Sequence, residues 1–176
     1  MNDLDSVVSI ESDTFEMSQE MTQKDMIGRI ENYPDTFLVA EIDHQVVGHV
    51  FGPAFNKRYI EDEIYFKNHL NRKDDQYQTV LSLAVSPEFR KQGIATKLLD
   101  KLSKIAKKQN RTAVTLTCLP KLFSFYEKRG FVNEGKTSDD IPDPDNVSSF
   151  NMVKELSKRG FLINLFNLRF HFFIYN

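Results

Sequence analysis

Two segments near the start of the chain carry apolar residues at helical spacing. Residues 3–15 place apolar side chains three and four positions apart, which predicts a helix. Thr22–Asn32 predicts a second helix, because Thr22 can cap it with Asp25 three residues later and Pro34 stops it. The apolar positions of the first helix are Leu4, Val7, Val8, Ile10 and Phe15.

After these helices, the spacing of apolar residues changes to that of extended strands. Residues 37–40 and 46–51 are mostly apolar and flank a short polar turn at Asp43 and His44, which predicts a β-hairpin. Residues 56–75 are charged and aromatic, and they indicate only a short helix within residues 60–69.

From residue 78 onward, strand and helix patterns alternate. Residues 78–85 are apolar at nearly every position, as expected for a strand covered on both faces. An amphipathic helix follows, and then a strand over 112–117, a helix over 119–129 and strands over 131–134 and 149–154. The amphipathic helix has its apolar stripe at Ile94, Leu98, Leu99, Leu102, Ile105 and Ala106.

This order of elements predicts a mixed α/β (α+β) fold with an antiparallel N-terminal hairpin and a partly parallel sheet. The 176 residues, 40% hydrophobic and 27% charged, are typical of a soluble globular chain with one core. We predict one domain over residues 1–156 and an atypical apolar tail over 157–176. Polar residues interrupt that tail, which is too short for a membrane span of about 20 residues.

The cysteine content indicates the cellular compartment, and the charge distribution indicates where ligands could be attracted. The single cysteine, Cys118, excludes an internal disulfide and a cysteine-based zinc site. With a polar N-terminus that lacks a signal-peptide pattern, it predicts a cytoplasmic protein. Residues 1–88 hold 7 basic and 17 acidic residues, whereas residues 89–176 hold 16 and 8. This difference in charge between the two halves of the sequence has a function only if a binding site lies between them. The alternative is that each half forms a separately solvated surface.

Small and basic residues meet where residues 78–85 lead into the amphipathic helix. A helix N-terminus has unpaired N–H groups and the positive end of the dipole, so it favours an anion. Arg90 and Lys91 add positive charge, Gly93 permits close approach, and Ala95 adds little bulk. The segment lacks the Gly-Lys-Ser/Thr and Gly-x-Gly-x-x-Gly patterns of two common phosphate loops. The spacing alone leaves an anion site and a plain tight turn as equal alternatives.

Two motifs resemble a known family. LAVSPEFRKQGIATKLL is similar to the acetyl-CoA signature of the GNAT N-acetyltransferases, Gln/Arg-x-x-Gly-x-Gly/Ala. LTCLPKLFSFYEKRGFVNEG resembles their second conserved region, especially in the arylalkylamine N-acetyltransferase-like branch. The resemblance covers roughly residues 4–155. It implies a mixed central sheet flanked by helices, with parallel strands around acetyl-CoA as cosubstrate, and it implies no metal.

The resemblance also implies roles for individual residues. Tyr126 matches the family tyrosine near the CoA sulfur, and Phe125 would pack beside the pantetheine arm. A phenol can protonate the departing thiolate, because the two groups have comparable proton affinities. The backbone of Leu83, Ala84 and Val85 would pair with pantetheine, and the pyrophosphate cradle would consist of Arg90, Lys91, Gln92, Gly93, Ile94, Ala95 and Thr96.

The general base departs from the family pattern. The arylalkylamine enzymes carry two histidines on the strand before the cradle, where this chain has Val80 and Ser82, and neither accepts a proton near neutral pH. Other family members use a carboxylate that holds a water molecule, and Glu11 is one candidate. Glu11 as a solvated helix residue is an equal alternative, and His49 is a further candidate base.

We therefore expect direct acetyl transfer from acetyl-CoA to a small primary amine of the arylalkylamine or polyamine type. The acidic residues Glu61, Asp62 and Glu63 would attract a cationic amine, or they form an exposed loop. The alternatives are a CoA-binding module without catalysis and acetylation of peptide N-termini. We expect no nucleic-acid partner and keep a homodimer open. We also expect the family's first strand to be missing, since Met1–Asp3 leave no room for it.

Overall fold

The structure is a computed structural model, and it describes residues 3–67, 69–138 and 147–156. The described residues form two compact units. Unit 1 contains the residues up to Gly52 together with Ser82–Leu102, and unit 2 contains Pro53–Leu81 and the residues from Ser103 onward. Residues 139–146 and the predicted tail at 157–176 lie outside the described residues.

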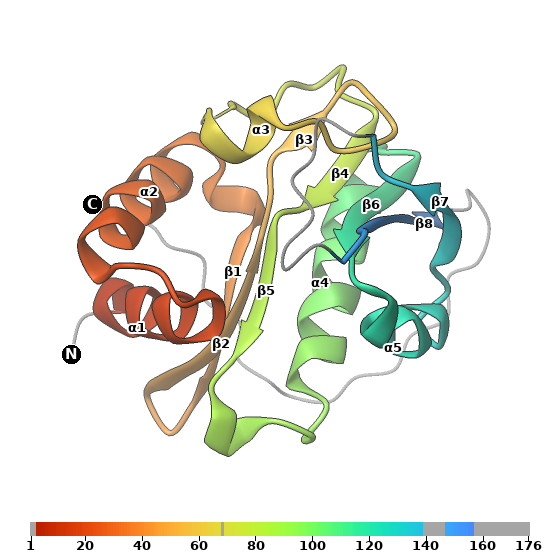
Figure 1. Ribbon diagram of the computed structural model, residues 1–176. Coiled ribbons are helices and arrows are strands. Elements are labelled where there is room, and N and C mark those ends of the chain that lie inside the picture. The colour runs from red at the N-terminus through yellow and green to blue at the C-terminus, as the bar shows by residue number, and fades with distance from the viewer. Residues whose placement is uncertain (1–2, 68, 139–146, 157–176) are drawn as a thin grey trace. The chain divides into compact units, whose positions relative to one another are not determined.

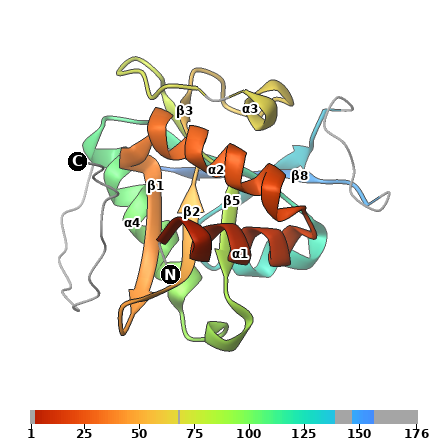
Figure 2. The same ribbon diagram turned by 90° about the vertical axis from the view of Figure 1, so that its left-hand side faces the viewer.

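Unit 1 consists of an antiparallel sheet with two helices on one face. The sheet has the order β1 (Phe37–Ile42), β2 (Gln45–Phe51), β5 (Ser82–Val85). Helices α1 (Asp3–Phe15) and α2 (Gln19–Asn32) lie side by side across these strands (Figures 1 and 2). The predicted hairpin and first helix are confirmed. The turn residues Asp43 and His44 both have positive φ, as a tight two-residue hairpin turn requires.

The start of α2 differs from the prediction. Ser18, not Thr22, is the N-cap residue, and its Oγ accepts a hydrogen bond of 3.3 Å from the Met21 N–H. Thr22 lies one turn further along, is fully buried, and donates its hydroxyl to the Ser18 carbonyl oxygen at 2.8 Å. Ser18 and Thr22 are both of residue types that cap helices. Thr22 is buried by packing within the fold, and Ser18 is the residue that caps α2.

The apolar run at 78–85 is divided at Leu81, where one strand was predicted. Its first part, β4 (Tyr77–Val80), pairs in parallel with β6 (Ala113–Cys118). Its second part, β5, pairs antiparallel with β2. The two parts therefore belong to different sheets and different units, which hydropathy alone does not distinguish because both are covered.

Unit 2 contains a five-stranded mixed sheet. Its order is β3 (Ala54–Phe55), β4, β6, β8 (Phe150–Glu155), β7 (Val132–Lys136), so β8 lies between β6 and β7. The predicted parallel component is the β4–β6 pair, and the other pairs are antiparallel. The helix predicted over 119–129 begins as a 3-10 turn at Pro120–Leu122 and continues as α5 (Phe123–Glu127), with Gly130 beyond it at φ +84°.

Opposite faces of this sheet carry different elements. Cys118 and Phe150 are register partners and share a face, which α5 covers through the edge-to-face contact of Phe123 with Phe150. Thr117 and Asn151 are the adjacent partners and face the other way. On that second face the Tyr65 hydroxyl of α3 (Glu63–Phe66) hydrogen bonds to the Thr117 hydroxyl at 2.9 Å.

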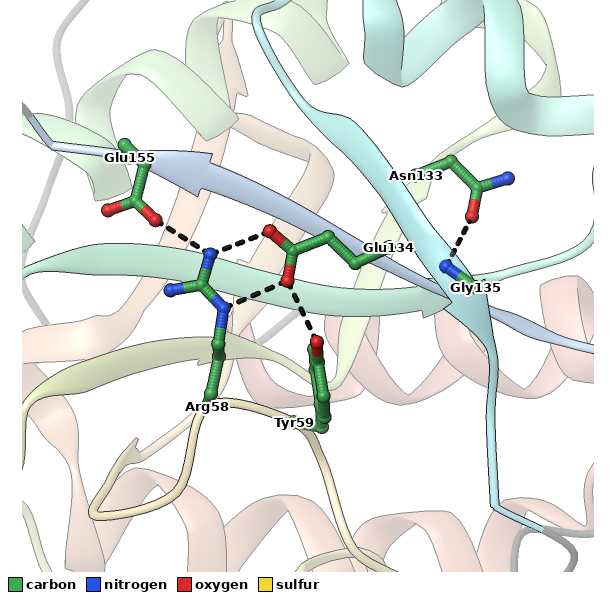
Figure 3. Close-up of polar contacts among 6 residues, drawn as sticks. All are labelled: Arg58, Tyr59, Asn133, Glu134, Gly135 and Glu155. Atoms are coloured by element: carbon green, nitrogen blue, oxygen red, sulfur yellow. Dashed lines mark hydrogen bonds and ion pairs between the residues drawn. The ribbon is translucent and has the colours of Figure 1, made fainter.

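The chain between β3 and α3 is fastened to the same sheet by an ion-pair cluster. Arg58 donates two hydrogen bonds to the Glu134 carboxylate, at 2.6 and 2.8 Å, and a third to Glu155 at 2.7 Å (Figure 3). The Tyr59 hydroxyl also donates to Glu134, at 3.0 Å. We call Arg58, Tyr59, Glu134 and Glu155 the Arg58 clamp. A bidentate arginine fixes orientation as well as distance, so the clamp defines where residues 56–66 lie on the sheet.

Helix α4 (Ile94–Lys108) confirms the amphipathic prediction. Its predicted stripe is buried at Ile94, Leu98, Leu99, Leu102 and Ala106, and Ile105 is partly buried. Its lysines lie off the stripe, and the exposed ones include Lys97 and Lys104. The helix begins immediately after Gly93, which determines where its unpaired N–H groups lie.

Candidate active site

The turn that precedes α4 has a backbone shape suited to an anion. Lys91 and Gly93 have φ values of +63° and +80°, with one residue between them. Such alternation turns successive N–H groups toward one side, which creates a concave anion-binding nest. The Gly93 carbonyl oxygen accepts the first helical hydrogen bond, from Lys97 N–H at 3.1 Å, so the N–H groups of Ile94 and Ala95 have no acceptor within the helix. Lys91, Gln92 and Gly93 are exposed.

Arg90 has a structural contact within this turn. Its Nε donates to the Val85 carbonyl oxygen at 2.9 Å, which ties the end of β5 to the start of the turn. The Gln92 amide donates to the Glu88 carbonyl oxygen at 3.4 Å. The structure therefore places the seven predicted cradle residues in one continuous turn and helix start.

Strand β5 is an edge strand of its sheet. The Ser86 N–H donates to the Val47 carbonyl oxygen at 2.9 Å, in register with the pairing of Val85 opposite Gly48. Because backbone groups alternate sides along an antiparallel ladder, Leu83 and Val85 direct their N–H and C=O groups away from β2. Ala84 directs its groups toward β2. Of the three residues predicted to pair with pantetheine, two thus have the required orientation.

Gly48 permits the close approach of β2 and β5. A Cβ atom at this position would lie 2.8 Å from the Ala84 carbonyl oxygen, closer than real Cβ contacts allow. The pairing that places β5 therefore depends on glycine at position 48.

A buried polar cluster joins α1, β2 and β5. The Ser82 hydroxyl donates to Glu11 Oε2 at 2.6 Å, and His49 Nε2 lies 2.8 Å from the same oxygen. His49 Nε2 also lies 3.3 Å from Ser82 Oγ. All three residues are at most 5% exposed. We call them the Glu11 cluster; the structure brings together three residues that were separate candidates in the sequence.

The hydrogen-bonding roles in the Glu11 cluster follow from its geometry. When Glu11 is ionised its carboxylate oxygens only accept, so His49 Nε2 is then the donor in this contact. His49 Nδ1 then has no hydrogen-bond partner among the described residues. The aromatic rings of Phe37 and Phe51 pack near His49, and burial raises the pKa of the nearby Tyr33, with the Glu11 charge as a smaller cause. Glu11 itself is only 5% exposed, so the alternative that it is a solvated helix residue is wrong.

Tyr126 lies in unit 2, on the α5 face of the sheet. It is 8% exposed, and Phe125 and Phe131 contact its ring edge to face. Burial is the largest cause that raises the pKa of Tyr126, and the Cys118 thiol adds to it, against the lowering effect of Arg129. The phenol therefore keeps its proton at neutral pH and remains a hydrogen-bond donor. Phe125 also has the Arg129 guanidinium 3.6 Å above its ring centroid.

Cys118 is buried and free. Burial, with the Glu127 charge as a smaller cause, raises the pKa of Cys118 to about 11. It therefore remains a thiol at neutral pH, which disfavours a nucleophilic role.

Sequence reasoning missed the Arg58 clamp. Arg58 and Tyr59 lie in the segment with no readable period, and their carboxylate partners are distant in sequence. No local signal links residues 75 or more positions apart.

Within the described ranges no helix has the length and apolarity to cross a membrane, and no group of His, Cys, Asp or Glu is arranged to hold a metal ion.

Comparison with known families agrees with the motifs. The profile of the Acetyltransferase (GNAT) family matches residues 4–131. This match covers well over half of the chain, so the protein belongs to the GNAT acetyltransferase family. Its class is therefore that of an N-acetyltransferase, an acyltransferase enzyme. No curated protein matches the chain.

Solved structures confirm the mixed α/β GNAT fold. Ard1 from Thermoplasma volcanium is 20% identical, with a TM-score of 0.66 over 89% of this chain and 93% of that one. An aminoglycoside 6'-N-acetyltransferase complexed with coenzyme A is 15% identical, with a TM-score of 0.66 over 89% and 92%. A GNAT-like decarboxylase, GphF, complexed with isobutyryl-CoA, is 16% identical, with a TM-score of 0.70 over 88% and 95%. At these identities the likeness shows the fold alone.

Proposed function

We propose that the protein transfers an acetyl group from acetyl-CoA directly to a small primary amine, as in the arylalkylamine N-acetyltransferase-like branch. The observation that carries this proposal is the continuity of an edge strand, β5, with an anion-binding turn at the start of α4. An edge strand can accept an extended amide chain, and the turn can accept phosphates. Acetyl-CoA has both parts in that order.

The residues present fit acetyl-CoA. Leu83 would hydrogen bond to the pantetheine amides through its outward N–H and C=O groups. Val85 would do so through its outward N–H, because its carbonyl oxygen already accepts from Arg90. The N–H groups of Gly93, Ile94 and Ala95 would bind the pyrophosphate, with Lys91 adding positive charge. Bound acetyl-CoA supplies an activated thioester. The complexes of structural relatives with coenzyme A and isobutyryl-CoA support this choice of ligand.

Tyr126 is the general acid in this proposal. The departing thiolate needs a proton, and the protonated phenol of Tyr126 can donate one, although burial raises its pKa and makes it a weaker acid than a free tyrosine. Its match to the family tyrosine in FYEKRGF is the second support. Phe125 would pack beside the pantetheine arm.

The Glu11 cluster would accept the proton of the amine. The Ser82 hydroxyl donates to Glu11, so its lone pairs can accept a proton that a water molecule passes on from the substrate ammonium. As that proton reaches Ser82 Oγ, the hydroxyl proton passes to Glu11 Oε2, and the neutral amine attacks the acetyl carbonyl. Ser82 thus carries the proton without acting as a base itself, and His49 holds the carboxylate in place.

The test combines an acceptor screen with a cradle variant. The purified full chain is mixed with acetyl-CoA and with arylalkylamines, polyamines or peptides with free N-termini, and CoA release is followed with a thiol reagent. We expect release with small primary amines. No release with any amine, together with tight acetyl-CoA binding, would instead indicate a binding module without catalysis.

Ala95→Asp tests the cradle itself. A negative charge in the first turn stabilises a helix but repels pyrophosphate, so folding is retained while the acetyl-CoA Kd rises at least tenfold. Ala95→Ser is the matched control and should bind normally. Equal acetyl-CoA affinity in Ala95→Asp and the wild type would contradict the cradle.

A further inference from the structure

The face of the unit 2 sheet that α3 covers carries an unusual set of polar side chains. Thr115 and Thr117 lie two residues apart on β6 and therefore face the same way. Asn151, on β8, is the register partner of Thr117 and shares that face. The Tyr65 hydroxyl oxygen hydrogen bonds to Thr117 Oγ1 at 2.9 Å. Tyr65, Thr117 and Asn151 therefore meet at the carboxyl end of β6.

Several oxygens of this group lack partners in the described part of the chain. Asn151 is 6% exposed, and its Nδ2 donates to the Lys136 carbonyl oxygen at 3.3 Å. That bond leaves Asn151 Oδ1 as a shielded acceptor without a donor. Thr115 Oγ1, in a fully buried residue, is also without a hydrogen bond within the described ranges. A buried unpaired polar atom costs about 1–3 kcal/mol, so native proteins keep few of them.

Asp62 carries a carboxylate on the turn that also holds Tyr65. Its neighbours Glu61 and Glu63 form ion pairs with Lys57 and Lys67, each one helical turn away. Asp62 Oδ1 is shielded and, among the described residues, has no hydrogen-bond partner. Asp62 lies three residues before Tyr65, whose N–H donates to the Asp62 carbonyl oxygen at 3.1 Å, so the two residues share one turn.

The chemistry of these atoms indicates the missing ligand. A carboxylate and an amide oxygen accept hydrogen bonds and cannot donate. Their complement is a group with several N–H donors and a positive charge. A phosphate or a carboxylate would be repelled. A primary ammonium has a positive charge and three donors, so it can bind to acceptors of these kinds.

We propose that Asp62, Tyr65, Thr117 and Asn151 form the subsite that binds the ammonium group of the acceptor amine. This inference rests on the proposed function, since it names the part of unit 2 that recognises the acetyl acceptor. Asp62 provides the charge attraction, and Thr117 and Asn151 provide directed acceptors.

The Arg58 clamp acts as a positioning device for the subsite. It fastens the start of the 56–66 segment to β7 and β8, and the Tyr65–Thr117 bond holds the end of that segment (Figure 3). Phe55, Ile60 and Ile64 pack together as a buried core within unit 2, with Tyr65 and Leu81 against it. Asp62 and Tyr65 are therefore held on the sheet face at three points.

The test uses the full chain saturated with CoA and two probe amines, 2-phenylethylamine and spermidine. Binding is measured by calorimetry, and KM is measured by CoA release from acetyl-CoA. We expect Asn151→Leu and Thr117→Val to weaken binding and to raise the KM of at least one probe tenfold or more. The acetyl-CoA Kd should stay unchanged, and kcat should change less than threefold. Asp62→Asn should weaken binding and remove most of its dependence on salt concentration.

Matched variants separate binding from folding. Thr117→Ser keeps a hydroxyl and should lose less affinity than Thr117→Val. Thr112→Val makes the same chemical change at an exposed position and should have no effect. If the unpaired oxygens of Asn151 and Asp62 do not bind the amine, their removal should leave the protein equally or more stable and the KM of the amine unchanged. Unchanged amine affinity in Asn151→Leu and Asp62→Asn, or failure of the wild type to bind either probe, would overturn the subsite.

Calorimetry also distinguishes the two proposals from each other. If the probes bind and the variants weaken them, the subsite is supported even where no acetyl group is transferred. In that outcome only the proposed catalysis is contradicted.

Discussion

The two units each contain a cluster of ionisable side chains, and the clusters differ in their contact with water. In the Glu11 cluster the three residues are at most 5% exposed, and two donors share one carboxylate oxygen. In the Arg58 clamp the side chains of Arg58, Glu134 and Glu155 are 33%, 25% and 63% exposed. The hydrogen-bond lengths are similar in both. The comparison shows that distance alone does not indicate what an ionic contact contributes.

The reason is solvation. A buried carboxylate that loses its partners, or partners that lose their carboxylate, have no water to replace the bond. An exposed pair that breaks is rehydrated, and its contribution is about 1 kcal/mol or less. The Glu11 cluster should therefore govern both stability and rate, whereas the clamp should chiefly position residues 56–66.

The largest expected effect comes from Glu11→Ala. This change leaves the buried Ser82 hydroxyl and His49 Nε2–H without an acceptor, so we expect a loss of about 3 kcal/mol in the free energy of unfolding, measured with urea. Glu155→Ala is the exposed counterpart and should change it by less than about 0.5 kcal/mol. Equal losses in the two variants would contradict the comparison.

Tyr126→Phe should affect rate without comparable loss of stability. Removal of a general acid lowers kcat roughly 10²-fold, equivalent to about 2.7 kcal/mol, while acetyl-CoA affinity changes little. The phenyl ring keeps its packing against Phe125 and Phe131. Steady-state kinetics with a responsive amine provide the measurement, and a kcat equal to that of the wild type would remove Tyr126 from the mechanism.

Gly48→Ala tests the strand pairing that places β5. The new Cβ would meet the Ala84 carbonyl oxygen at 2.8 Å, so the two strands must separate. We expect a loss of about 2 kcal/mol in unfolding free energy and weaker acetyl-CoA binding. Gly93→Ala is the matched change, because no atom lies within 4 Å there and only its positive φ opposes alanine. It should cost about 1 kcal/mol.

The smallest expected effect concerns the Arg58 clamp. The hydrogen bonds from Arg58 are the largest cause that lowers the pKa of Glu134. A carboxyl whose pKa is lower in the folded protein contributes stability above its unfolded pKa and loses that contribution as the pH falls through the folded value. Glu134→Gln should therefore lower the unfolding free energy by about 1 kcal/mol or less at pH 7, and the difference from wild type should disappear in acid.

Thermal unfolding at several pH values measures this difference. Lys104→Gln, at an exposed helix position, is the control and should show no such pH-dependent difference. A difference that grows below about pH 4 would show that the sign is wrong.

Local pattern was sufficient for most elements. The helix over 3–15 and the hairpin around Asp43 were predictable because helical period and turn residues are local properties. The division of the 78–85 run was not, since both halves are equally apolar and only their pairing partners differ. The Ser18 cap of α2 was missed because burial of Thr22 is decided by packing.

The candidate site shows the same division. The sequence by itself was enough to predict the cradle from Arg90 to Thr96 and the role of Tyr126, because each lies in a short motif that resembles one of the family's. Only the tertiary structure decided that Glu11, His49 and Ser82 share one buried oxygen, and that Asn151 faces Thr117 beneath Tyr65. Residues 33 to 71 positions apart meet through strand register and helix packing. Those contacts depend on the whole fold, and no local pattern encodes them.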